Sequence, residues 1–169
     1  MRPLTLELNY FGPFRHEKVD FTKFNDFPVF LISGKTGAGK TTIFDAMCFA
    51  LFGSTSGGDR QVKQMRSDFA TDDELTTVTF TFEHQDRTYK IVRSPEQTVA
   101  KKRGTGNHVQ VAAVTLTVFD ATGQEIDEYT KVNAVQNYIH ELLQLTREQF
   151  SQIVLLPQGQ FRQFLMANS

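Results

Sequence analysis

Eight residues near the start of the chain have the types and the spacing needed to bind a polyphosphate. They fit the pattern G-x-x-x-x-G-K-[ST] and run Gly34, Lys35, Thr36, Gly37, Ala38, Gly39, Lys40 and Thr41. Glycines adopt backbone angles that side chains forbid, so successive N–H groups can turn inward around an anion. The Lys40 ammonium suits the β- and γ-phosphates, and the Thr41 hydroxyl suits Mg²⁺. These eight residues and the adjacent Thr42 are therefore predicted to bind a nucleotide, with Lys40 as a catalytic residue.

The segments on either side of this loop are those that a phosphate-binding loop requires. An apolar run at residues 28–33 predicts a buried strand that leads into the loop. Apolar residues then recur at helical spacing between 43 and 51, which predicts a helix from about Lys40 to Gly53. The helix dipole adds positive partial charge where the phosphate would lie. The alternative is a glycine turn that only joins a strand to a helix.

Composition limits the possible classes of protein. A length of 169 residues supports one domain or one lobe, and 40% apolar residues can form a real core. The net charge of -1 gives no support for nucleic-acid binding by overall charge. The lone Cys48 excludes an intrachain disulfide and fits a buried, inert thiol in a reducing compartment. No signal peptide or membrane-length apolar run occurs, so a cytoplasmic location is expected.

Alternating apolar residues predict a set of antiparallel strands. The predicted strands are 4–10, its partner 16–21, the hairpin 75–84 and 88–93, a third strand 109–119, and a short return strand beginning at 125. Residues 75–127 therefore form a β-hairpin layer. Residues 94–108 are predicted to be a loop with a basic tip at 101–103.

Helical signals dominate the remainder of the chain. A turn is predicted at 62–65, and a helix with an apolar face begins after Thr130, its predicted N-cap. Thr146 is predicted to cap a helical turn over 146–150. A short apolar run then breaks at Pro157-Gln158-Gly159, and a last helix begins at about 160.

Three stretches resemble one family. A strand, a Phe-Gly-Pro-Phe turn at 11–14 and a second strand precede the loop. Residues 41–47 (TTIFDAM) resemble the helix that follows the phosphate loop in SMC-like ATPases. Residues 155–165 (LLPQGQFRQFL) resemble the Q-loop and the start of the coiled coil in the SbcC family. The chain as a whole thus resembles the N-terminal ATPase lobe of that family.

This resemblance implies an α/β fold: an ABC/SMC-type P-loop NTPase half-domain with an antiparallel β layer and flanking helices, filling 1–169 as a single lobe. It implies ATP and Mg²⁺ as cofactors. Gln158 would be the Q-loop glutamine at 155–161, catalytic and a metal ligand, because an amide can both accept and donate. The alternative for Gln158 is an exposed polar residue in a Pro-Gly turn. The implied partners are a C-terminal ATPase lobe of the same protein, a second SbcC protomer, an SbcD-type nuclease subunit and DNA, with no membrane.

The chain also departs from the family pattern. An aspartate for Mg²⁺ and an adjacent glutamate to activate water should follow a second apolar strand. The only acidic cluster, Asp72-Asp73-Glu74, follows no such strand and reads better as a solvated loop. The signature motif is also missing, since Ser56-Gly57-Gly58 opens no helix. The resemblance therefore implies ATP binding with little turnover by this fragment alone.

Other functions remain open at this point. A GTPase would need Asn-Lys-x-Asp, which is absent, and Asp120-Ala121-Thr122-Gly123 reads better as a hairpin turn than as a switch. A small P-loop kinase would need an arginine-rich lid, and a transport ATPase subunit would also contain the glutamine. Residues 101–103 with His108 could contact DNA phosphates, although a solvated loop is favoured. The histidines show no zinc-ligand spacing with the cysteine.

Overall fold

A six-stranded antiparallel sheet forms the centre of the fold. The computed structural model describes residues 1–24, 32–56, 62–101 and 103–154. The strand order is β2-β1-β3-β4-β7-β8, and all neighbours are antiparallel. The strands are β1 Arg2–Asn9, β2 His16–Asp20, β3 Thr77–His84, β4 Arg87–Ser94, β5 Gln97–Ala100, β6 Asn107–Gln110, β7 Ala113–Phe119 and β8 Glu125–Tyr129. The helices are α1 Lys40–Phe52, α2 Val132–Leu143 and α3 Arg147–Val154, with 3-10 turns η1 Phe21–Phe24 and η2 Val62–Met65.

The alternating sequence pattern places one face of each central strand in the core. Leu6 pairs with Phe80, Phe80 with Ile91, and Ile91 with Leu116, and all four side chains are fully buried. Successive strand residues point to opposite faces, so this row forms one continuous apolar stripe across the sheet. The predicted N-terminal strand pair, the hairpin that follows and the short return strand are confirmed.

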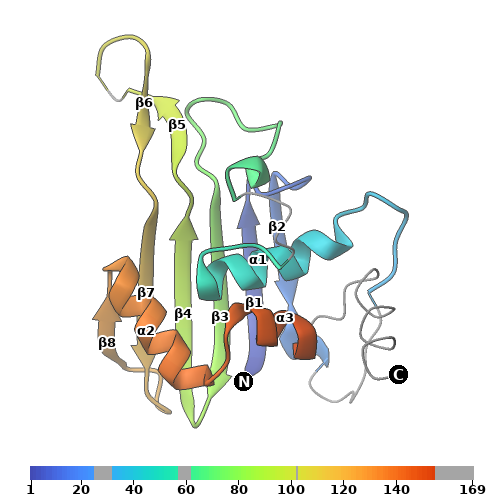
Figure 1. Cartoon of the computed structure of the whole chain (residues 1–169), viewed down its shortest axis with the longest axis vertical. Coiled ribbons are helices and arrows are strands. Elements are labelled where there is room, and N and C mark those ends of the chain that lie inside the picture. The colour runs from blue at the N-terminus through green and yellow to red at the C-terminus, as the bar shows by residue number, and fades with distance from the viewer. Residues whose placement is uncertain (25–31, 57–61, 102, 155–169) are drawn as a thin grey trace.

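The segment between β4 and β7 differs from the prediction. The predicted loop at 94–108 contains β5, which pairs with β6 in a separate two-stranded ribbon. The predicted single strand at 109–119 is therefore two strands, β6 and β7. Val111, 71% exposed, lies where the chain leaves the ribbon and enters the sheet. Figure 1 shows the ribbon extending beyond the end of the main sheet.

Helices α1, α2 and α3 lie on one face of the sheet (Figure 1). Helix α1 contacts β1, β3 and β4, and eight of its residues from Thr42 to Leu51 are buried. It ends at Gly53, whose φ of 75° and N–H bond to the Phe49 carbonyl (2.8 Å) terminate the helix. The predicted helix is confirmed. The strand predicted just before the loop falls largely on residues 25–31, outside the described residues, and Ile32 and Ser33 belong to no strand.

The starts of the last two helices test the two predicted caps. The N-cap of α2 is Lys131, whose carbonyl accepts from Val135 N (3.0 Å), so the prediction of Thr130 is wrong by one residue. The prediction for Thr146 is confirmed. Its hydroxyl accepts from Gln149 N (3.2 Å), and the Gln149 side-chain oxygen accepts from Thr146 N (2.9 Å). These reciprocal bonds form a capping box ahead of α3.

Candidate functional site: a phosphate-binding loop at the start of α1

Two left-handed glycines shape the loop before α1. Gly37 has φ 85° and Gly39 has φ 83°, a conformation that strains any residue with a side chain. Between them, Ala38 N donates to the Lys35 carbonyl (3.1 Å) and closes a turn. Gly39 is the N-cap of α1, and no side chain among the described residues caps that end. The N–H groups of the first helical turn are therefore available to an external acceptor.

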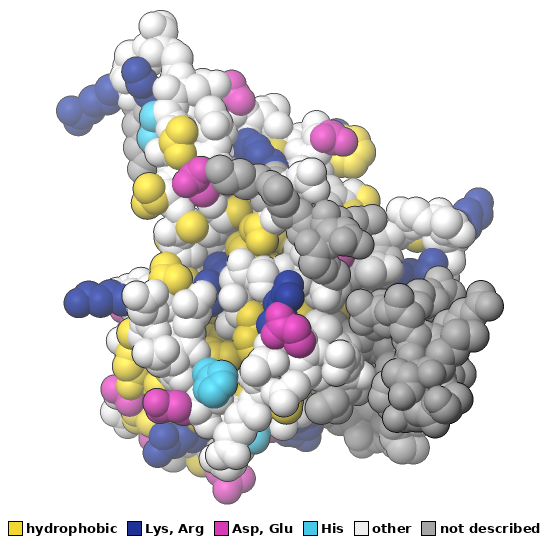
Figure 2. Space-filling view, in the orientation of Figure 1, with side chains coloured by type: hydrophobic (Ala, Val, Ile, Leu, Met, Phe, Trp, Pro, Cys, Tyr) yellow, Lys and Arg dark blue, Asp and Glu magenta, His cyan; other side chains and the backbone are white. Residues whose placement is uncertain are grey.

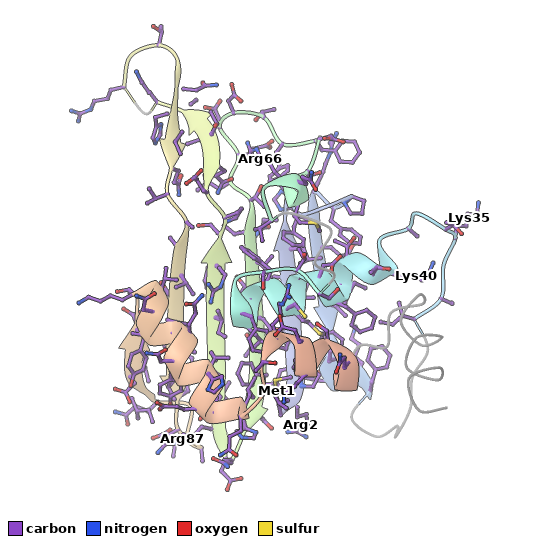
Figure 3. All side chains as sticks on the ribbon, viewed as in Figure 1. Met1, Arg2, Lys35, Lys40, Arg66 and Arg87 are labelled. Carbon is purple, nitrogen blue, oxygen red and sulfur yellow. The ribbon has the colours of Figure 1, made fainter. Side chains whose placement is uncertain are left out.

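The Lys40 side chain folds back over the loop. Its ammonium donates to the carbonyl oxygens of Gly34 (2.7 Å) and Lys35 (2.9 Å). An ammonium has three donors, so these bonds fix its place over the loop without using its full capacity. Figure 3 shows Lys40 where α1 begins and Lys35 at the outer end of the loop. Positive charge and helix N–H groups thus meet at one place.

The residues predicted to bind the nucleotide differ in their exposure to solvent. Residues 34–38 and Thr41 are exposed, whereas Gly39 and Lys40 are half-buried. A Cβ built on Gly37 would meet no atom of the described residues within 4 Å, so the space beside that glycine is open within this part of the structure. Thr42 is buried (4% exposed) and faces Gly12. An exposed hydroxyl at Thr41 is the hard oxygen donor that Mg²⁺ prefers, so the residues present fit a magnesium–phosphate group.

Part of the predicted site lies outside the described residues. Gln158, the predicted catalytic and metal-binding glutamine, falls there with the whole Q-loop at 155–161 and the start of the last helix. These residues remain predictions.

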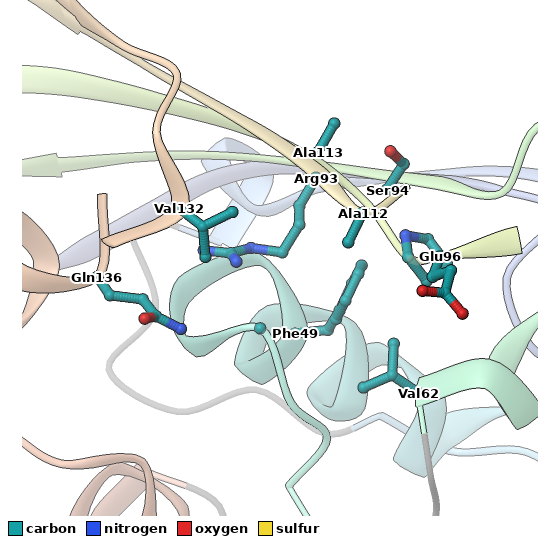
Figure 4. A pocket seen from close by; sticks show the side chains of 11 residues that line it. Phe49, Val62, Arg93, Ser94, Glu96, Ala112, Ala113, Val132 and Gln136 are labelled. Atoms are coloured by element: carbon teal, nitrogen blue, oxygen red, sulfur yellow. The ribbon is translucent and has the colours of Figure 1, made fainter. Parts of the chain in front are cut away.

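A buried arginine at the far end of α1 was not singled out by sequence reasoning. Arg93 of β4 donates from Nε to the Ala50 carbonyl (2.9 Å) and from Nη2 to the Leu51 carbonyl (3.5 Å). It is 5% exposed, and burial lowers the pKa of its guanidinium to about 10. Arg93 lines a cavity of about 250 Å³ together with Phe49 and Val132, and Figure 4 shows these three side chains. The available signal was the alternation of β4, which places residue 93 on the buried face.

The acidic cluster at 72–74 serves the local fold. Glu74 accepts from the Tyr10 hydroxyl and from Thr71 N (2.8 Å), and the bond from Tyr10 contributes most to lowering the pKa of that carboxyl. Asp72 accepts from the side chain of Asn107 on the ribbon (2.9 Å). Asp72 and Asp73 are exposed, as expected for a solvated loop. Among the residues that the structure describes, no group of acids, histidines and cysteine could hold a metal ion.

Two further predicted features can be located. Asp120 accepts from Thr122 N (2.8 Å) and Gln124 N (3.0 Å), so residues 120–123 form the predicted hairpin turn between β7 and β8. Lys101, Arg103 and His108 are exposed on the ribbon, and Figure 2 shows basic side chains at its end. Their contact with DNA remains a prediction. No helix in the described part of the chain is long and apolar enough to cross a membrane.

Comparison with known proteins connects this loop to a family. The model of the AAA domain family matches residues 5–169. The whole chain is 48% identical to the SbcC subunit of the SbcCD nuclease of Lactococcus lactis, 47% identical to that of Vibrio cholerae and 43% identical to that of a Staphylococcus aureus strain. It spans only 16% or 17% of the length of these relatives.

These matches confirm two predictions: the resemblance to the SbcC family, and the α/β P-loop NTPase fold class with an antiparallel β layer. The matching family model covers the loop, the helix that it begins and the sheet beneath that helix. The chain belongs to the AAA domain family.

Proposed function

We propose that this chain is the ATP-binding N-terminal lobe of an SbcC-type ATPase and that it binds ATP with Mg²⁺ at residues 34–42. The observation that carries the proposal is a left-handed glycine loop ahead of a helix start that no described side chain caps, with the Lys40 ammonium bonded to two carbonyls of that loop. A triphosphate offers the negative charge and the acceptor oxygens that such a loop favours. The similarity of the whole chain to SbcC subunits of SbcCD nucleases supports the same assignment.

Each residue has a role in this proposal. Lys40 exchanges its bonds to the Gly34 and Lys35 carbonyls for bonds to phosphate oxygens. The N–H groups from Gly39 onward bind phosphate at the positive end of the α1 dipole. Thr41 and Gln158 are the proposed Mg²⁺ ligands. The metal would neutralise phosphate charge, and the chain's own part is to bind and orient the nucleotide.

The longer protein is also part of the proposal. The chain spans 16% of the length of the Lactococcus lactis relative. In this proposal the complete assembly also contains a C-terminal lobe, a second protomer and an SbcD-type nuclease subunit. Closure of two nucleotide domains over two ATP molecules would then drive the processing of DNA ends in repair and recombination. The proposed location is the cytoplasm. In this proposal the group that activates water lies outside the chain, so the fragment binds ATP with little turnover.

Calorimetric titration of the 169-residue chain with Mg²⁺ and ATP tests the assignment. We expect saturable binding and a rise in Kd of about 100-fold for Lys40→Ala, since a charge-assisted bond contributes about 1.5–3 kcal/mol. The matched control is Lys90→Ala, which removes an exposed lysine of β4 outside residues 34–42 and should leave Kd within about three-fold. A flat titration on folded protein would refute the proposal.

Two further readouts separate the alternatives. A strong preference for GTP, or phosphate transfer to a nucleoside monophosphate, would favour a GTPase or kinase. Rapid ATP hydrolysis by the chain alone, abolished in Lys40→Ala, would contradict the expectation of low turnover.

A further inference from the structure

The turn at residues 11–14 packs directly against the glycine that begins α1. A Cβ built on Gly39 would lie 2.5 Å from Cζ of Phe14 and 2.9 Å from Cγ of Pro13. Atoms do not approach so closely, so this turn occupies the space that a side chain at 39 would need. The other left-handed glycine of the loop, Gly37, differs, because a Cβ built there would meet no atom of the described residues within 4 Å. Gly39 is therefore restricted twice, by its φ of 83° and by the Phe14 ring.

The same turn also touches the first turn of α1. A Cβ built on Gly12 would lie 2.6 Å from Cγ2 of Thr42, which is 4% exposed. The backbone of the turn thus lies against the helix while its Phe14 ring lies against the loop. Together the two contacts brace the junction at which the phosphate-facing N–H groups begin.

The turn is itself anchored from behind, so its position does not depend on the loop. Tyr10 N donates to the Arg15 carbonyl (2.7 Å), which closes the base of the turn. Gly12 N donates to the Met65 carbonyl (2.7 Å), and Ser67 N donates to the Tyr10 carbonyl (2.9 Å). Phe11 is fully buried and stacks on Phe49 of α1 with 5.7 Å between ring centroids. A turn held by its backbone and by the core can hold Phe14 firmly against Gly39.

We propose that Phe14 is a positioning residue for the phosphate-binding loop. Its ring holds Gly39 in the left-handed conformation from which the N–H groups of Lys40 and Thr41 face the phosphate. The ring acts through the glycine and need not touch the nucleotide. This inference rests on the proposed function, because it assumes that the loop binds a triphosphate. Its physical basis is preorganisation: a loop already in its binding conformation loses less entropy when the ligand arrives.

The variant Phe14→Ala in the 169-residue chain tests this role. We expect its Kd for Mg²⁺–ATP, measured by calorimetry, to rise about 10-fold. Without nucleotide, the amide ¹H–¹⁵N resonances of Gly39 and Lys40 should shift, because the ring no longer restrains them. The matched control is Phe52→Ala, which removes a half-buried ring that packs on Phe150 (5.4 Å between centroids) at the other end of α1. That variant should lose stability but keep Kd within about two-fold.

The outcomes separate this inference from the proposed function. Suppose that the wild type binds Mg²⁺–ATP and that Phe14→Ala has the same Kd and the same Gly39 resonance. The role of Phe14 would then be overturned, and ATP binding would stand. Absence of wild-type binding would refute the proposed function and, with it, this role. If Phe14→Ala does not fold, Phe14→Leu decides the question. Its side chain stops short of the ring's far edge, so we expect Kd to rise about three-fold, and a wild-type Kd would overturn the role.

Discussion

Helix α1 begins on Gly39, where no side chain in the described part of the structure caps it, whereas other parts of the protein cap its C-terminal end. There Gly53 turns the backbone, and Arg93 donates to the carbonyls of Ala50 and Leu51. Both ends carry partial charge from the same dipole, positive at the start and negative at the finish. The chain supplies its own cation at the negative end, whereas no described side chain caps the positive end.

We infer from this difference that the C-terminal end of α1 contributes to stability and that its N-terminal end is free to bind a ligand. Arg93 occupies a core position in the sheet, where it pairs with Val78 on one side and Val114 on the other. Its burial lowers the pKa to about 10, so the guanidinium is still charged at neutral pH. The interaction at the C-terminal end is permanent and buried. At the N-terminal end the corresponding interaction would come from a phosphate and would last only while the nucleotide is bound.

The largest expected effect comes from removing the permanent cation. Arg93→Ala should lower the free energy of unfolding by about 3 kcal/mol, because it leaves helix carbonyls without donors in a buried site. Denaturant unfolding measures this loss. The matched control is Lys90→Ala, an exposed cation on the same strand, which should stay within about 0.5 kcal/mol of the parent. If folded Arg93→Ala lost ATP affinity as strongly as Lys40→Ala, the separation of the two ends would be wrong.

The second test compares glycines at the two ends. Gly39→Ala and Gly53→Ala each place a Cβ at positive φ, and each Cβ meets a side-chain atom, Phe14 Cζ at 2.5 Å or Arg93 Nη1 at 2.9 Å. We expect each variant to lose about 1–3 kcal/mol of stability from backbone strain and crowding. Only Gly39→Ala should also raise Kd for Mg²⁺–ATP. Equal effects of the two substitutions on Kd would show that the helix ends are not independent.

The smallest effect concerns the middle of α1, where Cys48 is fully buried. Burial raises the pKa of its thiol from 9.0 to about 11, because it disfavours the thiolate. Below pH 9 the Cys48 thiol keeps its proton in both the folded and the unfolded chain, so its contribution to the free energy of unfolding is fully present. Between pH 9 and about 11 only the unfolded chain loses the proton, so stability falls as the pH rises.

Between pH 8 and pH 10 this loss should amount to about 1 kcal/mol. Urea unfolding of the wild type and of Cys48→Ala at both values measures it. The difference in unfolding free energy between the two proteins should be smaller at pH 10 than at pH 8. An equal difference at both pH values would contradict the raised pKa of Cys48.

The sequence predicted features that depend on neighbouring residues better than features that depend on residues far apart in the chain. Period-two alternation identified β1, β3 and β4, because a half-buried strand must alternate. The same rule failed at β5 and β6, where Gln97 is buried and Val109 is 59% exposed. Gln97 is buried because its side-chain oxygen accepts from Thr76 N (2.8 Å), a contact between residues 21 positions apart. Alternation carries no information about such a partner.

The candidate site shows the same limit. The types and spacing of residues 34–41 were enough to predict the loop, and the resemblance to the family is confirmed by relatives that match the whole chain. Arg93 is not in that motif, and its contact with the end of α1 spans more than 40 residues. Phe14 lies in a turn that the sequence marks, but its contact with Gly39 depends on how the turn packs. Residue types and spacing therefore predicted where the loop lies, and the contacts that Phe14 and Arg93 make with α1 were not predictable from them.

The most direct measurement is a map of backbone amide resonances as Mg²⁺–ATP is added to the 169-residue chain. If a triphosphate binds at the N-terminal end of α1, the largest changes in amide resonance are those of Gly37, Gly39, Lys40 and Thr41. The amide resonances of Gly53 and Arg93 should not change. Shifts concentrated on the ribbon or around Arg93, or no shifts at saturating nucleotide, would contradict a phosphate site at the start of this helix.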